Sequence, residues 1–103
     1  MESPCLIKVY YLTKEDILFI QKQMTLRFGG LVVSDTNIKN DDGFEYLIDA
    51  ASMSMFDEEA YPTIWLKAAI YIHTINCNHI FHDGNKRTGL ASALLYLEKN
   101  GII

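Results

Sequence analysis

The sequence has few cysteines, no long hydrophobic run and no excess of positive charge. Cys5 and Cys77 lie far apart among the 103 residues, which excludes a disulfide-rich secreted domain and a CxxC metal site. We expect both thiols to be reduced, and Cys77 to be buried. No apolar stretch reaches the roughly 18 residues of a membrane span, and Met1–Pro4 lacks the basic head of a signal peptide. These absences predict a cytoplasmic protein without membrane contact.

The charge balance argues against a polyanion as a general partner. Nine Lys and Arg residues stand against thirteen Asp and Glu residues, for a net charge of −4. Nucleic-acid backbones attract the opposite sign, so we expect no direct nucleic-acid binding. Segment 35–59 holds eight of the acids and one base, and we expect it to face solvent. Length and an apolar fraction of one half predict one globular domain over residues 1–103.

Hydrophobic periodicity predicts a mainly α fold, a compact helical bundle. The expected helices span residues 13–28, 42–55, 64–77 and 86–100. Thr13 and Asp16 form a capping-box pattern before the first helix, and Gly29 and Gly30 end it. The third helix is apolar nearly all round, which predicts a central helix buried on most sides.

Apolar spacing within these helices also predicts which side chains face the core. In the first helix these are Ile17, Ile20, Met24 and Phe28. In the second they are Phe44, Leu47, Ile48 and Ala51, and in the fourth they are Leu90, Ala93, Leu94 and Leu97. Strand signals are weak: we expect a short edge strand over 7–12 and a loop over 31–41 that contains a possible small β-hairpin.

The stretch between the third and fourth helices concentrates residues that bind phosphate. Gly84 permits backbone conformations that other residues avoid, and the start of the next helix offers unpaired N–H groups and a positive dipole end. Lys86 and Arg87 add two full charges at the same place. Two bases at a helix N-terminus oppose the dipole unless an anion lies between them, so the pattern predicts a phosphate-binding loop.

Three further side chains in the loop complete a candidate catalytic set. Asp83 can hold a hard cation such as Mg²⁺, which bridges phosphate oxygens. His79 can act as a general base near neutral pH. Phe81 lies between polar residues and is expected to bury its ring as a structural anchor for the loop. These residue types together favour phosphoryl or nucleotidyl transfer.

The string from His79 to Arg87 resembles the signature of the Fic/Doc superfamily, H-x-F-x-[D/E]-[G/A]-N-[G/K]-R, at every defined position. Lys86 stands where Fic adenylyltransferases have a second Gly, and Leu90 stands where they have a second Arg. Both departures resemble the Doc (death-on-curing) branch of toxins. The likeness continues over residues 10–101, with Phe28-Gly29-Gly30 after the first helix as one of its features.

The resemblance implies a role for each loop residue. His79 would deprotonate or position the acceptor hydroxyl, Asp83 would hold Mg²⁺, and Phe81 would anchor the loop. Gly84 and Asn85 would form the anion hole. Lys86 and Arg87 would bind the phosphates of ATP, with Arg87 also counted among the catalytic residues. In the Doc branch, the Lys for Gly replacement goes with an inverted nucleotide whose γ-phosphate faces the histidine.

The resemblance also implies partners. A Doc-like chain would be the kinase toxin of a type II toxin–antitoxin module, phosphorylating a threonine of elongation factor EF-Tu and blocking translation. The loop around Leu31 to Asn40 would be the flap that docks the target segment as an added strand. An inhibitory [S/T]-x-x-x-E-[G/N] helix is missing, because Glu59 follows Ser54 to Glu58. We therefore expect control in trans by a Phd-like antitoxin.

Three alternatives remain. The loop could serve a Fic-type adenylyltransferase that moves AMP to a target hydroxyl. A metal-dependent phosphohydrolase is the second alternative, with His73, His79, His82 and Asp83 as its metal ligands. Otherwise we expect His73 to be a core or near-site residue and His82 to be a variable exposed position. Family chains usually continue beyond the Asn100-Gly101 pair with a further helical segment, so a catalytically silent binding module is the third alternative.

Overall fold

The computed structural model describes residues 9–55 and 58–102. Its elements, in chain order, are α1 (Lys14–Phe28), α2 (Asp41–Ala50), β1 (Ser54–Met55), β2 (Glu58–Glu59), α3 (Ile64–Cys77) and α4 (Asn85–Lys99). The predicted mainly α bundle is confirmed. The first and third helices match the predicted spans to within one residue. The second ends five residues earlier than predicted, at Ala50.

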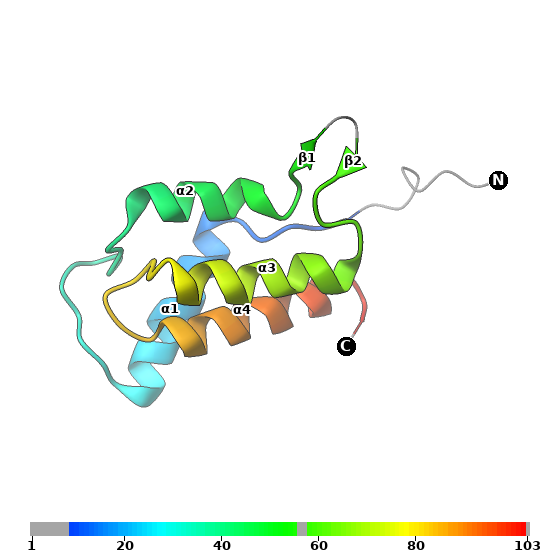
Figure 1. Ribbon diagram of the computed structural model, residues 1–103. Helices are drawn as coiled ribbons and strands as arrows, with labels where there is room; N and C mark the ends of the chain where they lie inside the picture. The colour runs from blue at the N-terminus through cyan, green and yellow to red at the C-terminus, as the bar shows by residue number, and fades with distance from the viewer. Residues whose placement is uncertain (1–8, 56–57, 103) are drawn as a thin grey trace.

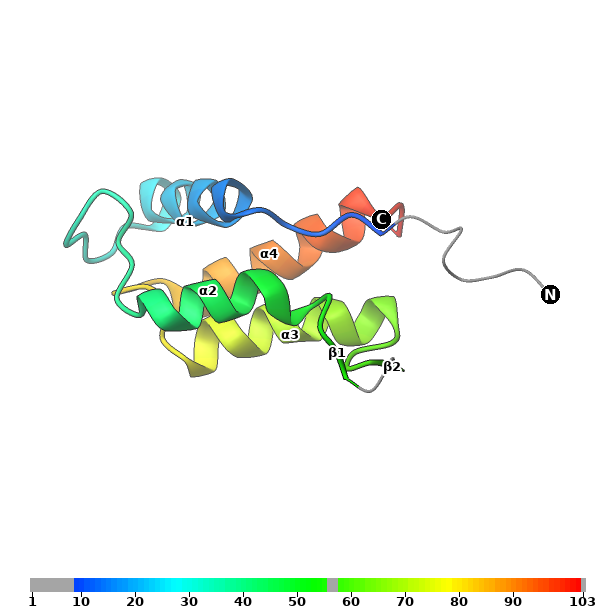
Figure 2. The same cartoon turned by 90° about the horizontal axis from the view of Figure 1, so that it is seen from above.

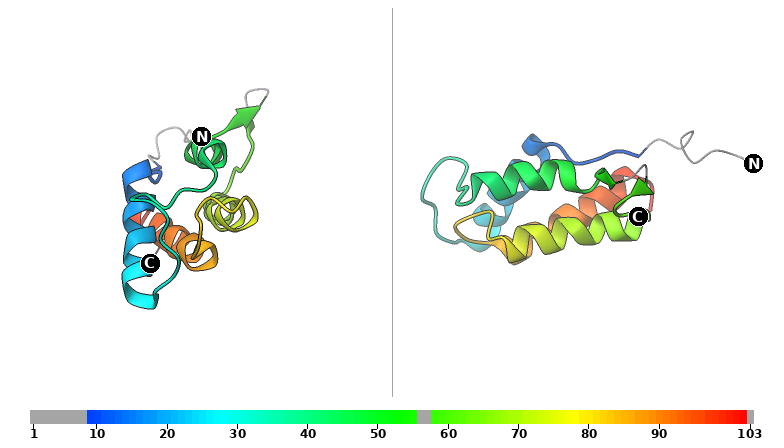
Figure 3. Two further views of the ribbon diagram at one scale, coloured as in Figure 1. Left: turned by 90° about the vertical axis from the view of Figure 1, so that its left-hand side faces the viewer. Right: turned by 45° about the horizontal axis from the view of Figure 1, so that its top comes forward.

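The four helices pack around one core in the order α1, α4, α3, α2. α3 and α4 lie side by side and share the most extensive contact, α1 packs on α4, and α2 packs on α3 (Figures 1 and 3). Segment 29–40 and the loop between α3 and α4 lie at the same end of the bundle (Figure 2). The hairpin β1–β2 lies at the opposite end. The fold thus brings the segment after α1 beside the loop that carries the candidate catalytic residues.

Local signals explain the bounds of α1. The Thr13 hydroxyl accepts the Asp16 N–H at 3.1 Å, and the Asp16 carboxylate accepts the Thr13 N–H at 2.9 Å, which completes the predicted capping box. Gly29 ends the helix with a φ of 76°. Phe28 was predicted to face the core, but 57% of it is exposed. Its ring turns instead toward the start of α4.

The core combines aliphatic side chains with four aromatic rings. Tyr71 and Tyr96 lie with their ring centroids 5.3 Å apart, and Phe44 and Phe81 lie 6.1 Å apart. The core cluster comprises Leu12, Ile17, Phe44, Leu47, Ala51, Ala68, Tyr71, Ile75, Ile80, Phe81, Ala93 and Tyr96. Because Ile80 and Phe81 belong to it, the loop between α3 and α4 is anchored from within the core.

α3 is less enclosed than its composition predicts. It buries Lys67, Ala68, Tyr71, Thr74 and Ile75, the face that meets α2 and α4. Trp65, Leu66 and Ile72 are exposed on its outer face. The expectation of burial on most sides is therefore wrong, because α2 and α4 cover one face of α3 and leave its outer face to solvent.

The inward face of α4 is also different from the predicted leucine stripe. The helix buries Thr88, Gly89, Ser92, Ala93 and Tyr96, whereas Leu90 and Leu94 are exposed. A Cβ at Gly89 would lie 3.2 Å from the Ile72 carbonyl oxygen. Of the predicted inward residues, Ala93 is buried and Leu97 packs against the core. Close approach of α3 selects the face with small residues, so the prediction is wrong for Leu90 and Leu94.

The strand predictions need two corrections. The antiparallel hairpin pairs Ser54 with Glu59 and Met55 with Glu58, so it does not lie within 31–41, where only a single β-bridge joins Ile38 to Phe81. Residues 9–12 are not a strand, and the rest of the predicted strand 7–12 lies outside the described residues, as does Cys5. The segment is held by Asn100, whose side-chain amide bonds the N–H and the carbonyl of Tyr10.

The acidic segment faces solvent where its side chains are described, as expected: Asp35, Asp41, Asp42, Glu45 and Asp49 are exposed. Glu45 pairs with Lys14 of α1, and Asp16 pairs with Lys99 of α4. Within residues 9–55 and 58–102, no helix has the length and apolarity needed to cross a bilayer.

Candidate active site

His79 lies where α3 ends, in a backbone conformation that glycine usually occupies. Its φ is 46°. The His79 N–H bonds the Asn76 carbonyl and the Ile80 N–H bonds the Ile75 carbonyl, both at 3.4 Å. This pair of hydrogen bonds is the Schellman motif, with histidine at the left-handed position and buried Ile80 and Ile75 in the accompanying apolar contact. Strained non-glycine residues concentrate at functional sites, and the strain here falls on the predicted base.

The loop after His79 is closed by an anchor and a brace. Phe81 is fully buried, which confirms its predicted burial. The Asn85 side chain bonds both the N–H and the carbonyl of Phe81, at 2.9 and 2.8 Å. With its side-chain amide occupied in this way, Asn85 can offer an anion its backbone N–H. Its predicted place in an anion hole would then be filled by the main chain.

The first turn of α4 presents donors and positive charge. Gly84 precedes the helix with a φ of 75°, a left-handed conformation that suits glycine. The N–H groups of Asn85, Lys86 and Arg87 lie in the first turn and therefore have no intrahelical acceptor. No side chain of the described residues caps the helix in their place. The Lys86 and Arg87 side chains are exposed. Together these groups present donors and positive charge at the place where the sequence predicts an anion site.

Asp83 is held by two backbone donors. Its Oδ2 accepts the Leu31 N–H and its Oδ1 accepts the Gly84 N–H, each at 2.8 Å. The hydrogen bond from Leu31, followed by that from Gly84, holds the pKa of Asp83 below its ordinary value. Desolvation opposes these bonds, and the charge of Arg87 adds a smaller lowering of the pKa. The carboxylate is therefore ionised at neutral pH, the form that binds a cation.

A cavity of about 590 Å³ gathers the predicted residues. It is lined by Asn76, His79, His82, Asp83, Gly84, Asn85, Lys86 and Arg87. This volume lies in the range of small-molecule sites. His82 was expected to be a variable exposed position, but it is half-buried and its N–H donates to the Asn37 carbonyl at 3.0 Å. Its backbone thereby ties the loop to segment 31–37.

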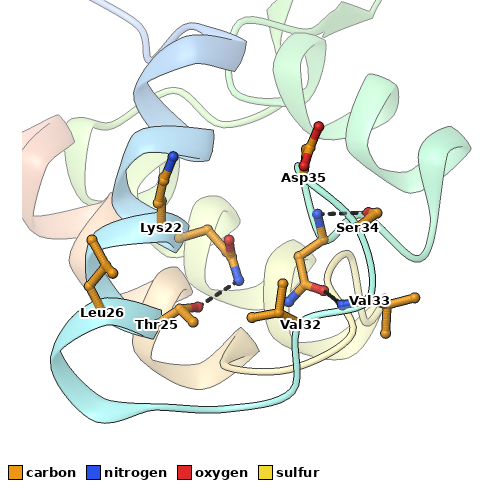
Figure 4. Close-up of a pocket in the computed structure, with 9 residues that line it drawn as sticks. Lys22, Thr25, Leu26, Val32, Val33, Ser34 and Asp35 are labelled. Atoms are coloured by element: carbon orange, nitrogen blue, oxygen red, sulfur yellow. Dashed lines mark hydrogen bonds between the residues drawn. The ribbon is translucent and has the colours of Figure 1, made fainter.

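A second hollow, of about 430 Å³, lies between α1 and the predicted flap. Leu26 and Thr25 of α1 line it on one side, and Val32 and Val33 line it on the other (Figure 4). Asn37, with a φ of 59°, shapes this segment: its side chain accepts the Val33 N–H and donates to the Leu31 carbonyl, both at 2.9 Å. The segment is thus an ordered loop that exposes two valines.

Two contacts that the sequence does not reveal join the end of α1 and the segment after it to the cavity. The Arg87 guanidinium lies over the Phe28 ring, 4.6 Å from its centroid, and the Leu31 N–H bonds Asp83. The partners are more than fifty residues apart in sequence, so no local spacing could reveal them. The one sequence feature that pointed to this region was the resemblance of Phe28-Gly29-Gly30 to the corresponding residues of the family.

Other candidate residues lie outside the cavity. His73 is exposed and contacts exposed Cys77, with Nδ1 and Sγ 3.6 Å apart, so the expectations of a core histidine and a buried thiol are wrong. α3 turns both to its solvent face. No three His, Cys, Asp or Glu side chains gather as a metal site among the described residues. The geometry therefore gives no support to the phosphohydrolase alternative.

The residues present fit a magnesium nucleotide. Mg²⁺ is commonly bound through one or two carboxylates together with substrate phosphates, and Asp83 supplies one exposed carboxylate at the cavity. A Cβ at Gly84 would find only the Thr88 Oγ1, 4.0 Å away, so the open space there suits close approach of a phosphate. The arrangement can hold phosphates at the start of α4, a cation at Asp83 and an acceptor beside His79.

Comparison with known proteins agrees with this geometry. The sequence model of the Fic/DOC family matches residues 11–97. "Toxin Doc" of Mycolicibacterium smegmatis is 36% identical over 97 residues, which cover 89% of this chain and 65% of that protein. "Protein kinase doc" of Escherichia phage P1 is 29% identical over 92 residues, which cover 89% of this chain and 69% of that protein.

The chain spans about two thirds of the length of these curated relatives. No solved structure matches it significantly. The family match covers most of the chain, including both the helical core and the loop with its cavity. Both relatives bear the name Doc, as the resemblance of the loop implied. This chain belongs to the Fic/DOC family.

Proposed function

We propose that the chain is a Doc-type kinase toxin that transfers the γ-phosphate of ATP to a protein hydroxyl, in the presence of Mg²⁺. The observation that carries the proposal is the single cavity shared by His79, Asp83 and the basic start of α4. Relatives named as a Doc toxin and a Doc protein kinase support it. We expect the acceptor to be a threonine of EF-Tu, whose modification would block translation in the cytoplasm.

Each residue has a defined part in the proposed reaction. His79 takes the proton of the acceptor hydroxyl as its oxygen bonds to the γ-phosphorus, and the bond from that phosphorus to the ADP oxygen breaks. Lys86, Arg87 and the N–H groups at the start of α4 stabilise the charge on the phosphates. Mg²⁺, held at Asp83, would supply charge neutralisation between phosphate oxygens. The acceptor and the γ-phosphate leave as a phosphothreonine, and ADP is released.

The flap offers one strand edge to a target peptide. The Leu31 N–H and carbonyl and the Val33 N–H are bonded inward, to Asp83 and Asn37. Successive residues of an extended chain direct their backbone groups to opposite sides, so Val32 turns its own groups outward. This arrangement supports docking of a target segment beside Val32, by addition of a strand.

Adenylyl transfer is the competing reaction of the same loop. Leu90, at the position of the second Arg in adenylyltransferases, is exposed and does not line the cavity. Incubation with EF-Tu, Mg²⁺ and ATP labelled at either phosphorus separates the two. We expect label from the γ-phosphate only, lost in His79→Ala and retained in His73→Ala, a histidine on the exposed face of α3. Transfer from the α-phosphate would establish the adenylyltransferase, and absence of any transfer would refute both.

Toxicity and its control form a second test. Expression of the chain should arrest growth, and Asp83→Ala or Lys86→Ala should relieve the arrest. Arrest that persists in both variants would contradict the proposed site. We also propose inhibition in trans by a Phd-like antitoxin; the exposed acids of α2, Asp41 and Asp42, are candidates for its contact. Co-expression of the neighbouring operon gene should restore growth.

A further inference from the structure

We propose that segment Phe28–Leu31, at the end of α1, is a positioning element for the two charged side chains of the site, Arg87 and Asp83. The inference rests on the proposed function, because these are the groups assigned there to phosphate and Mg²⁺. It gives the turn after α1 a second role besides ending the helix. The segment contacts both charges at once, one through a ring and the other through a backbone donor.

The first contact holds the Arg87 side chain from one face. Phe28 is 57% exposed and does not belong to the core, so core packing does not explain its orientation. Its ring lies under the Arg87 guanidinium, 4.6 Å from centroid to Cζ. A stacked guanidinium keeps the N–H groups at its edges available. The ring therefore restricts where Arg87 can lie and leaves its phosphate-binding donors accessible.

The second contact orients the Asp83 carboxylate. The Leu31 N–H reaches Oδ2 and the Gly84 N–H reaches Oδ1, so each oxygen receives one donor. A carboxylate oxygen has two lone pairs, and one on each oxygen is left for a cation. Outer donors of this kind fix the orientation of a metal-binding carboxylate. The flap backbone and the loop backbone thus hold Asp83 between them.

The glycine pair makes the second contact possible. Gly29 and Gly30 have φ values of 76° and 137°, which other residues adopt rarely. A Cβ at Gly30 would lie 3.0 Å from the Asp83 Oδ2, closer than side chains normally approach. The glycines turn the chain from α1 back over the loop and leave room for the carboxylate that Leu31 binds.

A pair of proline variants tests the Leu31 contact. Leu31→Pro removes the N–H that reaches Asp83, whereas Val32→Pro places the same ring in the same loop and leaves that N–H in place. If Leu31 positions Asp83, the Gly84 amide, which bonds the other carboxylate oxygen, will exchange faster with solvent in Leu31→Pro than in Val32→Pro. Mn²⁺ binding in the presence of ATP should weaken about tenfold or more in Leu31→Pro alone.

A pair of leucine variants tests the Phe28 contact. Phe28→Leu removes the ring under Arg87, and Phe19→Leu removes an equally exposed ring of the same helix. The Arg87 side-chain protons should lose their ring-current shift only in Phe28→Leu. The KM for ATP should rise about threefold in that variant with a smaller change in kcat, and Phe28→Tyr, which keeps an aromatic ring, should restore both.

The outcomes separate this inference from the proposed function. Equal Gly84 exchange in the two proline variants, or unchanged Arg87 shifts in Phe28→Leu, would overturn the positioning role even in an active kinase. A wild-type chain that neither binds Mn²⁺ and ATP nor transfers phosphate would refute the proposed function. In that case the exchange rates and the chemical shifts still decide whether segment 28–31 holds the two charges.

Discussion

The side-chain amide of Asn85 forms two hydrogen bonds with the backbone of Phe81, accepting its N–H at 2.9 Å and donating to its carbonyl at 2.8 Å. The first residue of α4 thereby braces the loop that precedes the helix. Because Phe81 is fully buried, water does not readily replace the amide. The pair therefore closes the turn from Phe81 to Asn85, which contains the cavity residues His82, Asp83 and Gly84.

Asn85→Ala should therefore destabilise the fold. The variant leaves two backbone groups of Phe81 without partners, and an unsatisfied buried group costs about 1–3 kcal/mol. We expect the free energy of unfolding in urea to fall by about 2 kcal/mol or more. Lys86→Ala, at the next and exposed position, should change it by less than about 0.5 kcal/mol. Equal stabilities of the two variants would contradict the bracing role.

His79→Gly should stabilise the protein and remove its activity. A left-handed conformation costs a residue with a Cβ about 1–2 kcal/mol, and the greater freedom of glycine in the unfolded chain offsets part of the gain. We expect the free energy of unfolding to rise by about 1 kcal/mol or less, and phosphate transfer to be lost. Asn76→Gly, within α3, should instead lower it by about 0.3 kcal/mol, because glycine is a poorer helix former than asparagine. A destabilised His79→Gly would show that the histidine side chain supports the fold.

Gly89→Ala should lower stability even though alanine favours helices. The new Cβ would lie 3.2 Å from the Ile72 carbonyl oxygen and 3.3 Å from its Cα, and these backbone atoms of α3 cannot move alone. The gain in helix propensity is about 1 kcal/mol, and overpacking typically costs about 1–3 kcal/mol. We expect a net loss of about 1 kcal/mol by urea unfolding. Ala91→Gly, in the same helix, measures the propensity effect separately, and a stabilised Gly89→Ala would mean that α3 and α4 adjust freely.

Tyr71 should make the fold sensitive to alkali. Burial raises its pKa to about 12 from an ordinary value of 10.0. The folded state therefore holds this proton more tightly than the unfolded state, so its contribution is complete below pH 10 and is lost as the pH rises to about 12. Two pKa units correspond to roughly 2–3 kcal/mol.

Tyr71→Phe provides the control for that pH dependence. The variant removes the ionisable group and also the acceptor of the Leu12 N–H, which lies 3.2 Å from the Tyr71 hydroxyl. We expect lower stability at neutral pH, by about 1 kcal/mol, and a shallower loss between pH 10 and 12. Parallel curves for wild type and variant in that range would assign the alkaline loss to other groups.

Features with local signals in the sequence were predicted well, whereas features that depend on contacts between distant segments were not. The bounds of α1 and α3 were predicted to within about one residue, because local signals such as the Thr13 cap and the Gly29-Gly30 stop act within one turn. The predicted hairpin was misplaced, because residues 31–37 satisfy their backbone through Asn37 and Asp83. Two of the predicted inward leucines of α4, Leu90 and Leu94, are exposed for a related reason: the partner helix requires Gly89 at the contact.

The sequence by itself determined the candidate site, since its residues lie within nine consecutive positions from His79 to Arg87 and belong to one motif. It also determined the mainly α class, through periodicity and caps. Only the tertiary structure decided that Phe28 and Leu31 reach Arg87 and Asp83. Contacts between distant segments arise when helices pack, and that packing depends on the shapes of both partners. A motif records the groups that meet the substrate, whereas the fold determines what holds those groups in place.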